Sequence, residues 1–276
     1  MTQLTAACLQ MCSSDIMEEN INKVCDLIVQ AADIGAQLIV TPEMTGLLDK
    51  TSGQQFAKSF SESNDPALPR LQRLAARLHI TLIVGSLSIQ ISNEKCANRC
   101  FVINPSGDII AKYDKIHLFD AVLGEGNFFN ESDDYRAGKE AVLTCTPSAM
   151  IGLSICYDLR FPQLYQTLAL AGAEVLTIPA AFTQITGEAH WHVLIRARAI
   201  ETGCFVLASA QSGKHADGRE TFGHSMIVNP WGDILAELES EPGFIIATLD
   251  IEQVREARAR IPSLSKKINY QSPSAS

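Results

Sequence analysis

Residues 151–165 read Ile151-Gly-Leu-Ser-Ile-Cys-Tyr-Asp-Leu-Arg-Phe-Pro-Gln-Leu-Tyr165, and they set how the rest of the chain is interpreted. The apolar residues before Cys156 alternate with smaller or polar ones, as they do in a strand. Pro162 stands where a first helical turn would begin, and apolar residues continue from there at helical spacing. We therefore expect Cys156 on a sharp turn between a strand and a helix. Such a turn lifts a side chain out of the sheet, and the helix N-terminus favours a thiolate.

Cys156 also has a simpler interpretation, because free cysteines are among the residues most often buried in cores. The choice between the two depends on other candidates in the chain. The chain has 276 residues, 46% of them hydrophobic, which is enough for a single large core. No linker is evident, so we expect one domain over residues 1–276, with a tail from about 262 that is mobile or used in assembly.

Charge and cysteine usage narrow the function classes. The net charge is −9 and no run is rich in Lys or Arg, which argues against a nucleic-acid partner. The eight cysteines include C-x3-C pairs at Cys8/Cys12 and Cys96/Cys100, and this spacing does not match a zinc site. A chain of this size also does not need disulfide bonds to be stable. We expect reduced thiols and no metal or cofactor.

The N-terminal segment has no basic region followed by an apolar core and a cleavage site, and no apolar run is long enough to cross a bilayer. We expect a soluble, cytoplasmic protein without a membrane partner.

Apolar periodicity predicts a mixed α/β chain in which some consecutive strands have no helix between them. This pattern suits two packed sheets with helices on both outer faces. The turns Asn104-Pro-Ser-Gly107 and Asn229-Pro-Trp-Gly232 suggest a repeated hairpin, Asp15 is a candidate helix cap, and 120–140 is the longest irregular stretch. We expect strands at 4–11, 38–40, 80–90, 100–104, 109–113, 141–145, 151–155, 175–179, 204–210, 224–229 and 244–249, and helices at 15–36, 69–78, from 162, at 190–202 and at 251–260.

Three residues that end predicted strands carry complementary chemistry. Glu43 follows a short buried strand, Lys115 follows the strand at 109–113, and Cys156 lies at its turn. A carboxylate can take the thiol proton and pass it to a leaving amine, while an ammonium stabilises the thiolate and the tetrahedral oxyanion. Attack on an amide would give a thioester that water hydrolyses.

At these residues the chain resembles the carbon–nitrogen hydrolase (nitrilase) superfamily. The resemblance implies an α-β-β-α sandwich and catalysis without metal or cofactor, with Glu43 as general base, Lys115 stabilising the oxyanion and Cys156 as nucleophile. It covers nearly the whole chain. The matching motifs are Pro42-Glu43, Tyr113-Asp-Lys-Ile-His117, Ile155-Cys-Tyr-Asp-Leu-Arg-Phe-Pro162, His190-Trp191 with Arg196-Ala-Arg-Ala199, and Gly223-His-Ser with Asn229-Pro-Trp-Gly232.

The superfamily has a second glutamate between the lysine and the cysteine, and two residues lie in that interval. Glu131, before Ala137-Gly138, matches the pattern better than Glu125. We assign Glu131 the role of orienting Lys115, against the alternative of a solvated loop charge.

Four residues are candidates for substrate contact. The backbone N–H of Tyr157 would be an oxyanion donor. Arg160 is interpreted first as a buried ion-pair partner at the turn and second as a ligand for a substrate carboxylate. Phe182 and Thr183 lie in the loop 180–187, which should line the pocket. The histidines, including His190 at an expected helix start, are interpreted as structural.

Within the superfamily, the segments 189–202, 210–213 and 222–226 look most similar to the deaminated-glutathione amidases, with the omega-amidases that hydrolyse 2-oxoglutaramate as near neighbours. The resemblance therefore implies an amidase for the side-chain amide of a small carboxylated 2-oxo acid. The alternatives are an omega-amidase and a catalytically idle scaffold. The resemblance also implies a homodimer.

Overall fold

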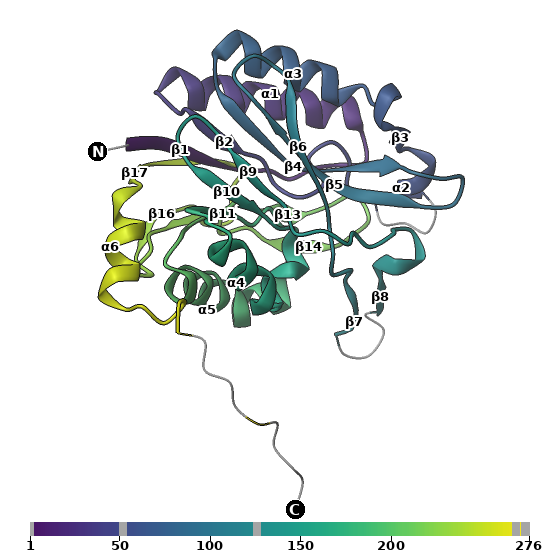
Figure 1. The fold of residues 1–276 in the computed structure, drawn as a ribbon. Coiled ribbons are helices and arrows are strands. Elements are labelled where there is room, and N and C mark those ends of the chain that lie inside the picture. The colour runs from purple at the N-terminus through teal and green to yellow at the C-terminus, as the bar shows by residue number, and fades with distance from the viewer. Residues whose placement is uncertain (1–2, 50–53, 124–127, 267–270, 272–276) are drawn as a thin grey trace, which may run out of the picture.

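The core of the protein is two β-sheets packed face to face, as seen in a computed structural model that describes residues 3–49, 54–123, 128–266 and 271 (Figure 1). The first sheet has the order β17-β1-β2-β4-β5-β6, with β3 paired to β4. The second has the order β16-β15-β12-β11-β10-β9. The first sheet comprises β1 (Gln3–Gln10), β2 (Leu38–Val40), β3 (Phe60–Ser61), β4 (Thr81–Gln90), β5 (Cys96–Ile103), β6 (Ile109–Asp114) and β17 (Gly243–Asp250), and the second comprises β9 (Leu143–Cys145), β10 (Met150–Leu153), β11 (Val175–Thr177), β12 (Phe205–Ala208), β15 (Met226–Val228) and β16 (Ile234–Glu237).

Helices cover both outer faces, so the predicted α-β-β-α sandwich is confirmed. In Figure 1, α1 (Met17–Asp33) and α3 (Ala67–Leu78) lie above the sheets, and α4 (Pro162–Leu170) and α5 (Gln184–Thr202) lie below them. The C-terminal α6 (Glu252–Arg260) lies at one side, and α2 (Gln54–Ala57) is a single turn. The short helices η1 (Glu62–Asn64), η2 (Glu131–Asp133) and η3 (Cys156–Arg160) and the hairpins β7 (Asp120–Val122)/β8 (Phe128–Asn130) and β13 (Ser212–Lys214)/β14 (Glu220–Phe222) complete the fold.

The first strand shows why this architecture is stable. Successive side chains of a strand point to opposite faces of its sheet. Leu4, Ala6 and Cys8 contribute to the core that includes the second sheet, whereas Ala7 and Leu9 pack with α1 and α3. Both faces of β1 are therefore buried, which explains its nearly continuous apolar residues.

Both Asn-Pro-x-Gly turns join antiparallel neighbours, β5 to β6 and β15 to β16, as the repeated hairpin predicted. Asn104 N–H donates to the Asp108 carbonyl at 2.9 Å, and Asn229 N–H donates to that of Asp233 at 2.9 Å. The glycine of each turn has φ of 88°. Since that conformation strains any residue with a Cβ, glycine is the residue that suits both turns.

Several predicted boundaries are wrong. Asp15 does not cap α1, because its carboxylate binds Lys58 Nζ at 3.0 Å. Helix α5 begins at Gln184 rather than at 190, because the Thr183 side chain accepts a hydrogen bond from Thr186 N–H and caps it. The stretch 120–140 is not irregular throughout, since it contains β7, β8 and η2. The C-terminal tail is described only at 262–266 and at 271.

Candidate active site

Strands from both sheets bring the three predicted catalytic residues to one place. Glu43 follows β2, Lys115 follows β6 directly, and Cys156 follows β10 after two residues. Their relative exposures are 3%, 2% and 8%, so all three are buried although two of them are ionisable residues of opposite charge. Charged side chains are rarely buried unless they are paired, and these are paired.

The ammonium of Lys115 lies between two carboxylates. Its Nζ is 2.9 Å from Glu43 Oε1 and 2.8 Å from Glu131 Oε2. Glu131 is 6% exposed, so the alternative of a solvated loop charge is wrong. The other predicted candidate, Glu125, lies outside the described residues. The two carboxylates are therefore both paired with the ammonium of Lys115.

Asn98 is part of the same network, and the sequence analysis did not identify it. This fully buried residue of β5 donates through Nδ2 to Glu43 Oε1 at 2.8 Å and to Glu131 Oε1 at 3.0 Å. Its amide therefore holds the two carboxylates in place while Lys115 neutralises part of their charge. A polar residue in the apolar run 96–103 was the only available signal.

The turn at Cys156 has the predicted form. Strand β10 ends at Leu153, η3 begins at Cys156, and α4 begins at Pro162. Cys156 has φ of 50°, a left-handed conformation that costs free energy and often occurs at functional sites. Its backbone N–H donates to the Pro179 carbonyl at 2.8 Å, which fixes the turn against the end of β11.

Buried Asp158 supports this turn rather than the cleft. Its Oδ2 accepts from Ile155 N–H at 2.9 Å and from the Tyr113 hydroxyl at 2.6 Å. Its Oδ1 contacts the ring of His117 at 2.7 Å. The interpretation of His117 as structural agrees with this contact.

The surroundings of Cys156 do not favour the thiolate that the helix N-terminus was expected to favour. Burial, and then the charge of Glu43, raise the pKa of Cys156, and the opposing effect of Lys115 is smaller. A single turn of 3-10 helix has little dipole to set against burial. Burial lowers the pKa of Lys115, but the charges of Glu131 and Glu43 outweigh it and raise this pKa well above its usual value. These shifts favour a neutral thiol at Cys156 beside a positively charged Lys115.

A small cleft opens beside the sulfur of Cys156. All four predicted substrate-contact residues line it, together with residues of the β6–β7 connection and of the start of α5. The lining residues are Phe119, Cys156, Tyr157, Arg160, Ala181, Phe182, Thr183 and Thr186.

The first interpretation of Arg160, a buried ion pair, is wrong. Within the described part of the chain its guanidinium has no carboxylate partner. It lies 5.3 Å from the ring centre of Phe182 and 5.9 Å from that of Tyr157, and it contacts His190 Nδ1 at 3.3 Å. The positively charged guanidinium of Arg160 therefore lies at the cleft, in contact with two aromatic rings and a histidine. His190 lies within α5 rather than at its start.

All eight cysteines, which lie among the described residues, are free thiols, as expected. Over the described ranges, none of the helices has both the length and the apolar character that crossing a membrane requires.

Comparison with known proteins gives consistent results. The profile of the family described as carbon-nitrogen hydrolase matches residues 5–259. The deaminated glutathione amidase of Synechocystis sp. (strain PCC 6803 / GT-S) is 39% identical over 268 residues, which cover 95% of this chain and 97% of that protein. The crystal structure of the C. elegans NitFhit protein has a TM-score of 0.90 and 32% identity and covers 97% of this chain, which spans only 65% of that one.

A second similar structure has a covalently modified cysteine. A variant of the amidase from Nesterenkonia sp. AN1 has a TM-score of 0.79 and 25% identity, with coverage of 94% of this chain and 95% of that one. In that protein the acetamide moiety of fluoroacetamide is attached covalently to the active-site cysteine.

Proposed function

The chain belongs to the carbon–nitrogen hydrolase family and is an amidase, and from this premise we propose that Cys156 is its nucleophile. The sulfur forms a bond to the amide carbonyl carbon while Glu43 takes the thiol proton. Because the pKa of Cys156 is raised, the proton has to leave as the bond forms, and a neighbouring carboxylate serves that need.

The other residues act on the tetrahedral intermediate. The ammonium of Lys115 and the backbone N–H of Tyr157 stabilise its oxyanion. When the carbon–nitrogen bond breaks, Glu43 returns its proton to the leaving ammonia. Water then attacks the thioester, Glu43 takes the proton of that water, and the carboxylic acid product leaves as the thiol is restored. Glu131 and Asn98 position Lys115 and Glu43 through their hydrogen bonds.

We propose that the substrate is the side-chain amide of a small 2-oxo acid, such as deaminated glutathione. The similarity to the deaminated glutathione amidase of Synechocystis supports this substrate, and so does the chemistry of Arg160. The guanidinium of Arg160 lies at the edge of an apolar cleft and has no carboxylate partner among the described residues, so it is suited to bind a substrate carboxylate. An omega-amidase for 2-oxoglutaramate and an inactive scaffold remain the competing hypotheses.

The main support for this proposal is that Glu43, Lys115 and Cys156 lie close together in one buried site. Ammonia release from deaminated glutathione and from 2-oxoglutaramate, compared by kcat/KM, tests it. We expect turnover of the first substrate to be faster, to be lost in Cys156→Ala and to be kept in Cys12→Ala. Faster turnover of 2-oxoglutaramate would favour the omega-amidase, and no turnover of any amide would favour the scaffold.

We also propose that residues 1–276 act as one domain, in a homodimer, in the cytoplasm. The eight free thiols support a reducing compartment. The large apolar side chains exposed on α5, Ile185, Val193 and Ile200, support the dimer.

A further inference from the structure

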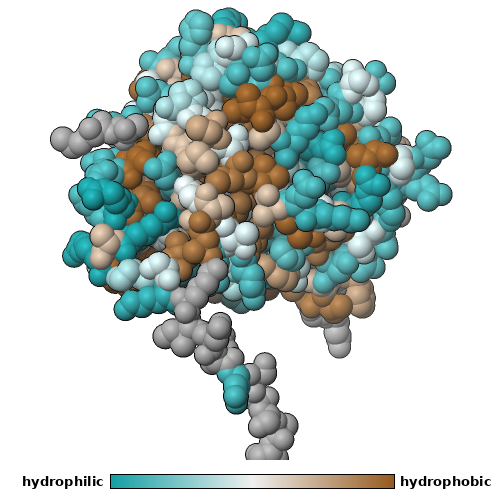
Figure 2. All heavy atoms as spheres, viewed as in Figure 1, coloured by the Kyte–Doolittle hydropathy of each residue, from teal (hydrophilic) through white to brown (hydrophobic). Residues whose placement is uncertain are grey.

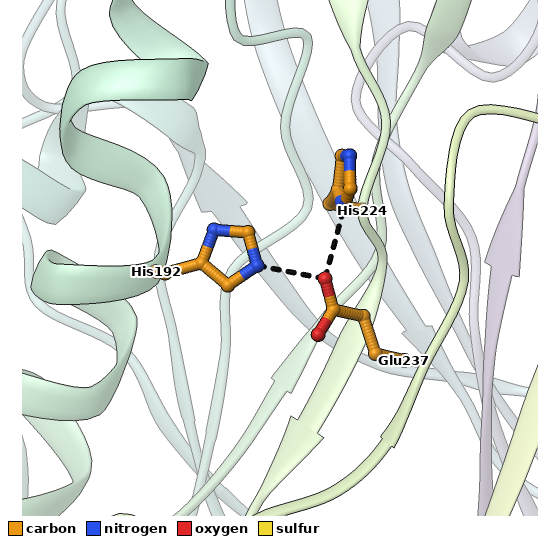
Figure 3. A group of neighbouring side chains, drawn as sticks. All are labelled: His192, His224 and Glu237. Carbon is orange, nitrogen blue, oxygen red and sulfur yellow. Dashed lines mark hydrogen bonds and ion pairs between the residues drawn. The ribbon is translucent and has the colours of Figure 1, made fainter.

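A second cluster of metal-ligating side chains lies away from the proposed catalytic residues. His192 comes from the middle of α5, His224 from the segment between β14 and β15, and Glu237 from the end of β16 (Figure 3). The potential ligand atoms of the three residues all lie within 4.8 Å of one another. Three separate elements thus direct their side chains to one point.

Both rings face the same carboxylate oxygen. Nε2 of His192 is 2.7 Å from Oε1 of Glu237, and Nδ1 of His224 is 2.8 Å from that oxygen. A carboxylate oxygen accepts, so each of these ring nitrogens carries a proton directed at Oε1. Zn²⁺ would bind these two nitrogens in the other neutral tautomer of each ring, in which the single proton lies on the other ring nitrogen.

The ring positions are supported by neighbouring groups. His224 stacks on Phe222 with ring centres 4.2 Å apart, and His192 lies edge-on to both of these rings. The backbone of His224 has φ of 54°, and its carbonyl accepts from Trp191 Nε1 at 2.8 Å. Ligands held in this way lose little side-chain freedom when they bind an ion.

The cluster is also accessible. The side chains of His192, His224 and Glu237 are 36%, 26% and 28% exposed, which allows an ion to enter and a water molecule to complete its shell. Tetrahedral zinc with ligands at about 2.0–2.2 Å places ligand atoms roughly 3.3 Å apart. Each ring nitrogen would therefore have to move about half an ångström away from Oε1 of Glu237. The two ring nitrogens, which lie within 4.8 Å of each other, would have to reach the same spacing.

We propose that His192, His224 and Glu237 form a binding site for Zn²⁺. Two imidazoles and one carboxylate are ligands typical of first-row divalent ions, and zinc accepts three protein ligands with a water in the fourth position. The bound ion joins α5 to β16, the edge strand of the second sheet, and so stabilises the folded chain by mass action. The site is independent of the proposed amidase activity.

Zinc titration of the metal-free chain tests the proposal. The Cys156→Ala variant is used throughout, because it removes a thiol that could compete for the ion. Calorimetry with ZnCl₂ after EDTA treatment and dialysis should show one equivalent bound. His192→Asn and Glu237→Gln should each weaken binding at least ten-fold. His79→Asn is the matched control, because this histidine follows α3 with φ of 53°, a conformation that asparagine tolerates, and it should leave binding unchanged.

Two further measurements distinguish a loss of ligands from a loss of structure. The metal-free variants should unfold at the same temperature as their parent, and zinc should raise this temperature in the parent but not in His192→Asn or Glu237→Gln. Co²⁺ bound at the site should give visible bands without thiolate charge transfer. Absence of saturable binding, binding unaffected by both substitutions, or a strong thiolate band would each overturn the proposal.

Discussion

Arg160 shows how a single side chain can select the substrate. We expect Arg160→Gln to lower kcat/KM for a carboxylated amide roughly 10- to 100-fold, the range that corresponds to about 1.5–3 kcal/mol for a hydrogen bond to a charged group. A neutral amide such as propionamide should be hydrolysed nearly as before. The ratio of the two kcat/KM values is the measurement, and an equal loss for both amides would mean that Arg160 only supports the cleft.

Glu43 has two effects on Cys156 that can be separated by measurement. Its negative charge raises the pKa of the thiol, so Glu43→Gln should lower that pKa. The same substitution removes the proposed base, so kcat should fall by about 10² or more. The pH dependence of Cys156 alkylation by iodoacetamide, followed by peptide mass spectrometry, should therefore show a lower midpoint in this nearly inactive variant. Glu140→Gln, at an exposed position, is the control, and an upward shift in Glu43→Gln would contradict the assignment.

Among the elements, β4 is essential to the site because of Gly85, which lies against the connections that carry catalytic groups. A Cβ built at Gly85 would lie 2.0 Å from the Thr41 carbonyl oxygen and 2.6 Å from Pro179 Cβ. Thr41 precedes Pro42-Glu43, and Pro179 accepts the hydrogen bond of the Cys156 N–H. The two sheets approach each other here too closely for a side chain.

We therefore expect Gly85→Ala to destabilise the protein by about 3 kcal/mol, at the upper end of the usual cost of overpacking, and to impair activity through Glu43. Urea unfolding measures the first effect and kcat the second. Gly243→Ala is the matched control, because its Cβ would meet one side-chain atom at 3.9 Å, and it should change neither. A stable and fully active Gly85→Ala variant would show that the two connections can shift independently.

The elements also show which features a sequence can predict. Buried strands such as β4, in which all residues between Thr81 and Gln90 are apolar or small, were predicted closely. The edge strand β16 was missed, because its four residues are mostly exposed and carry no alternation. The start of α5 was missed, because a threonine cap followed by polar residues and glycine resembles a loop. Asn98 and the unpaired state of Arg160 could not be predicted, because both depend on which distant residues the fold places beside them.

At the scale of the whole molecule, the sandwich explains why the site draws on residues so far apart in the chain. Glu43, Asn98, Lys115 and Glu131 come from the first sheet and its connections, and Cys156 comes from the second sheet. Motif resemblance identified four of these five residues. The motifs do not reveal the buried contacts that the fold creates, in which the ammonium of Lys115 and the amide of Asn98 both bind the carboxylates of Glu43 and Glu131.

The outer face of α5 leaves part of the molecule's apolar surface without a partner in the described chain. Ile185, Val193 and Ile200 lie on one side of the helix and are 61%, 69% and 54% exposed. Figure 2 shows apolar residues interrupting the hydrophilic surface of the face in view. Large apolar side chains exposed on one side of a helix are common at protein–protein interfaces.

We expect Val193→Glu to convert the proposed homodimer into a monomer, because a charge at the centre of an apolar interface has no water and no partner. Light scattering should give twice the chain mass of 30.0 kDa for the parent and one chain mass for the variant. Ile34→Glu is the matched control: Ile34 is 59% exposed but follows α1, on the other side of the sandwich, and the dimer should persist. A monomeric parent would contradict the homodimer. A dimer that survives Val193→Glu but not Ile34→Glu would place the interface on the other side of the sandwich.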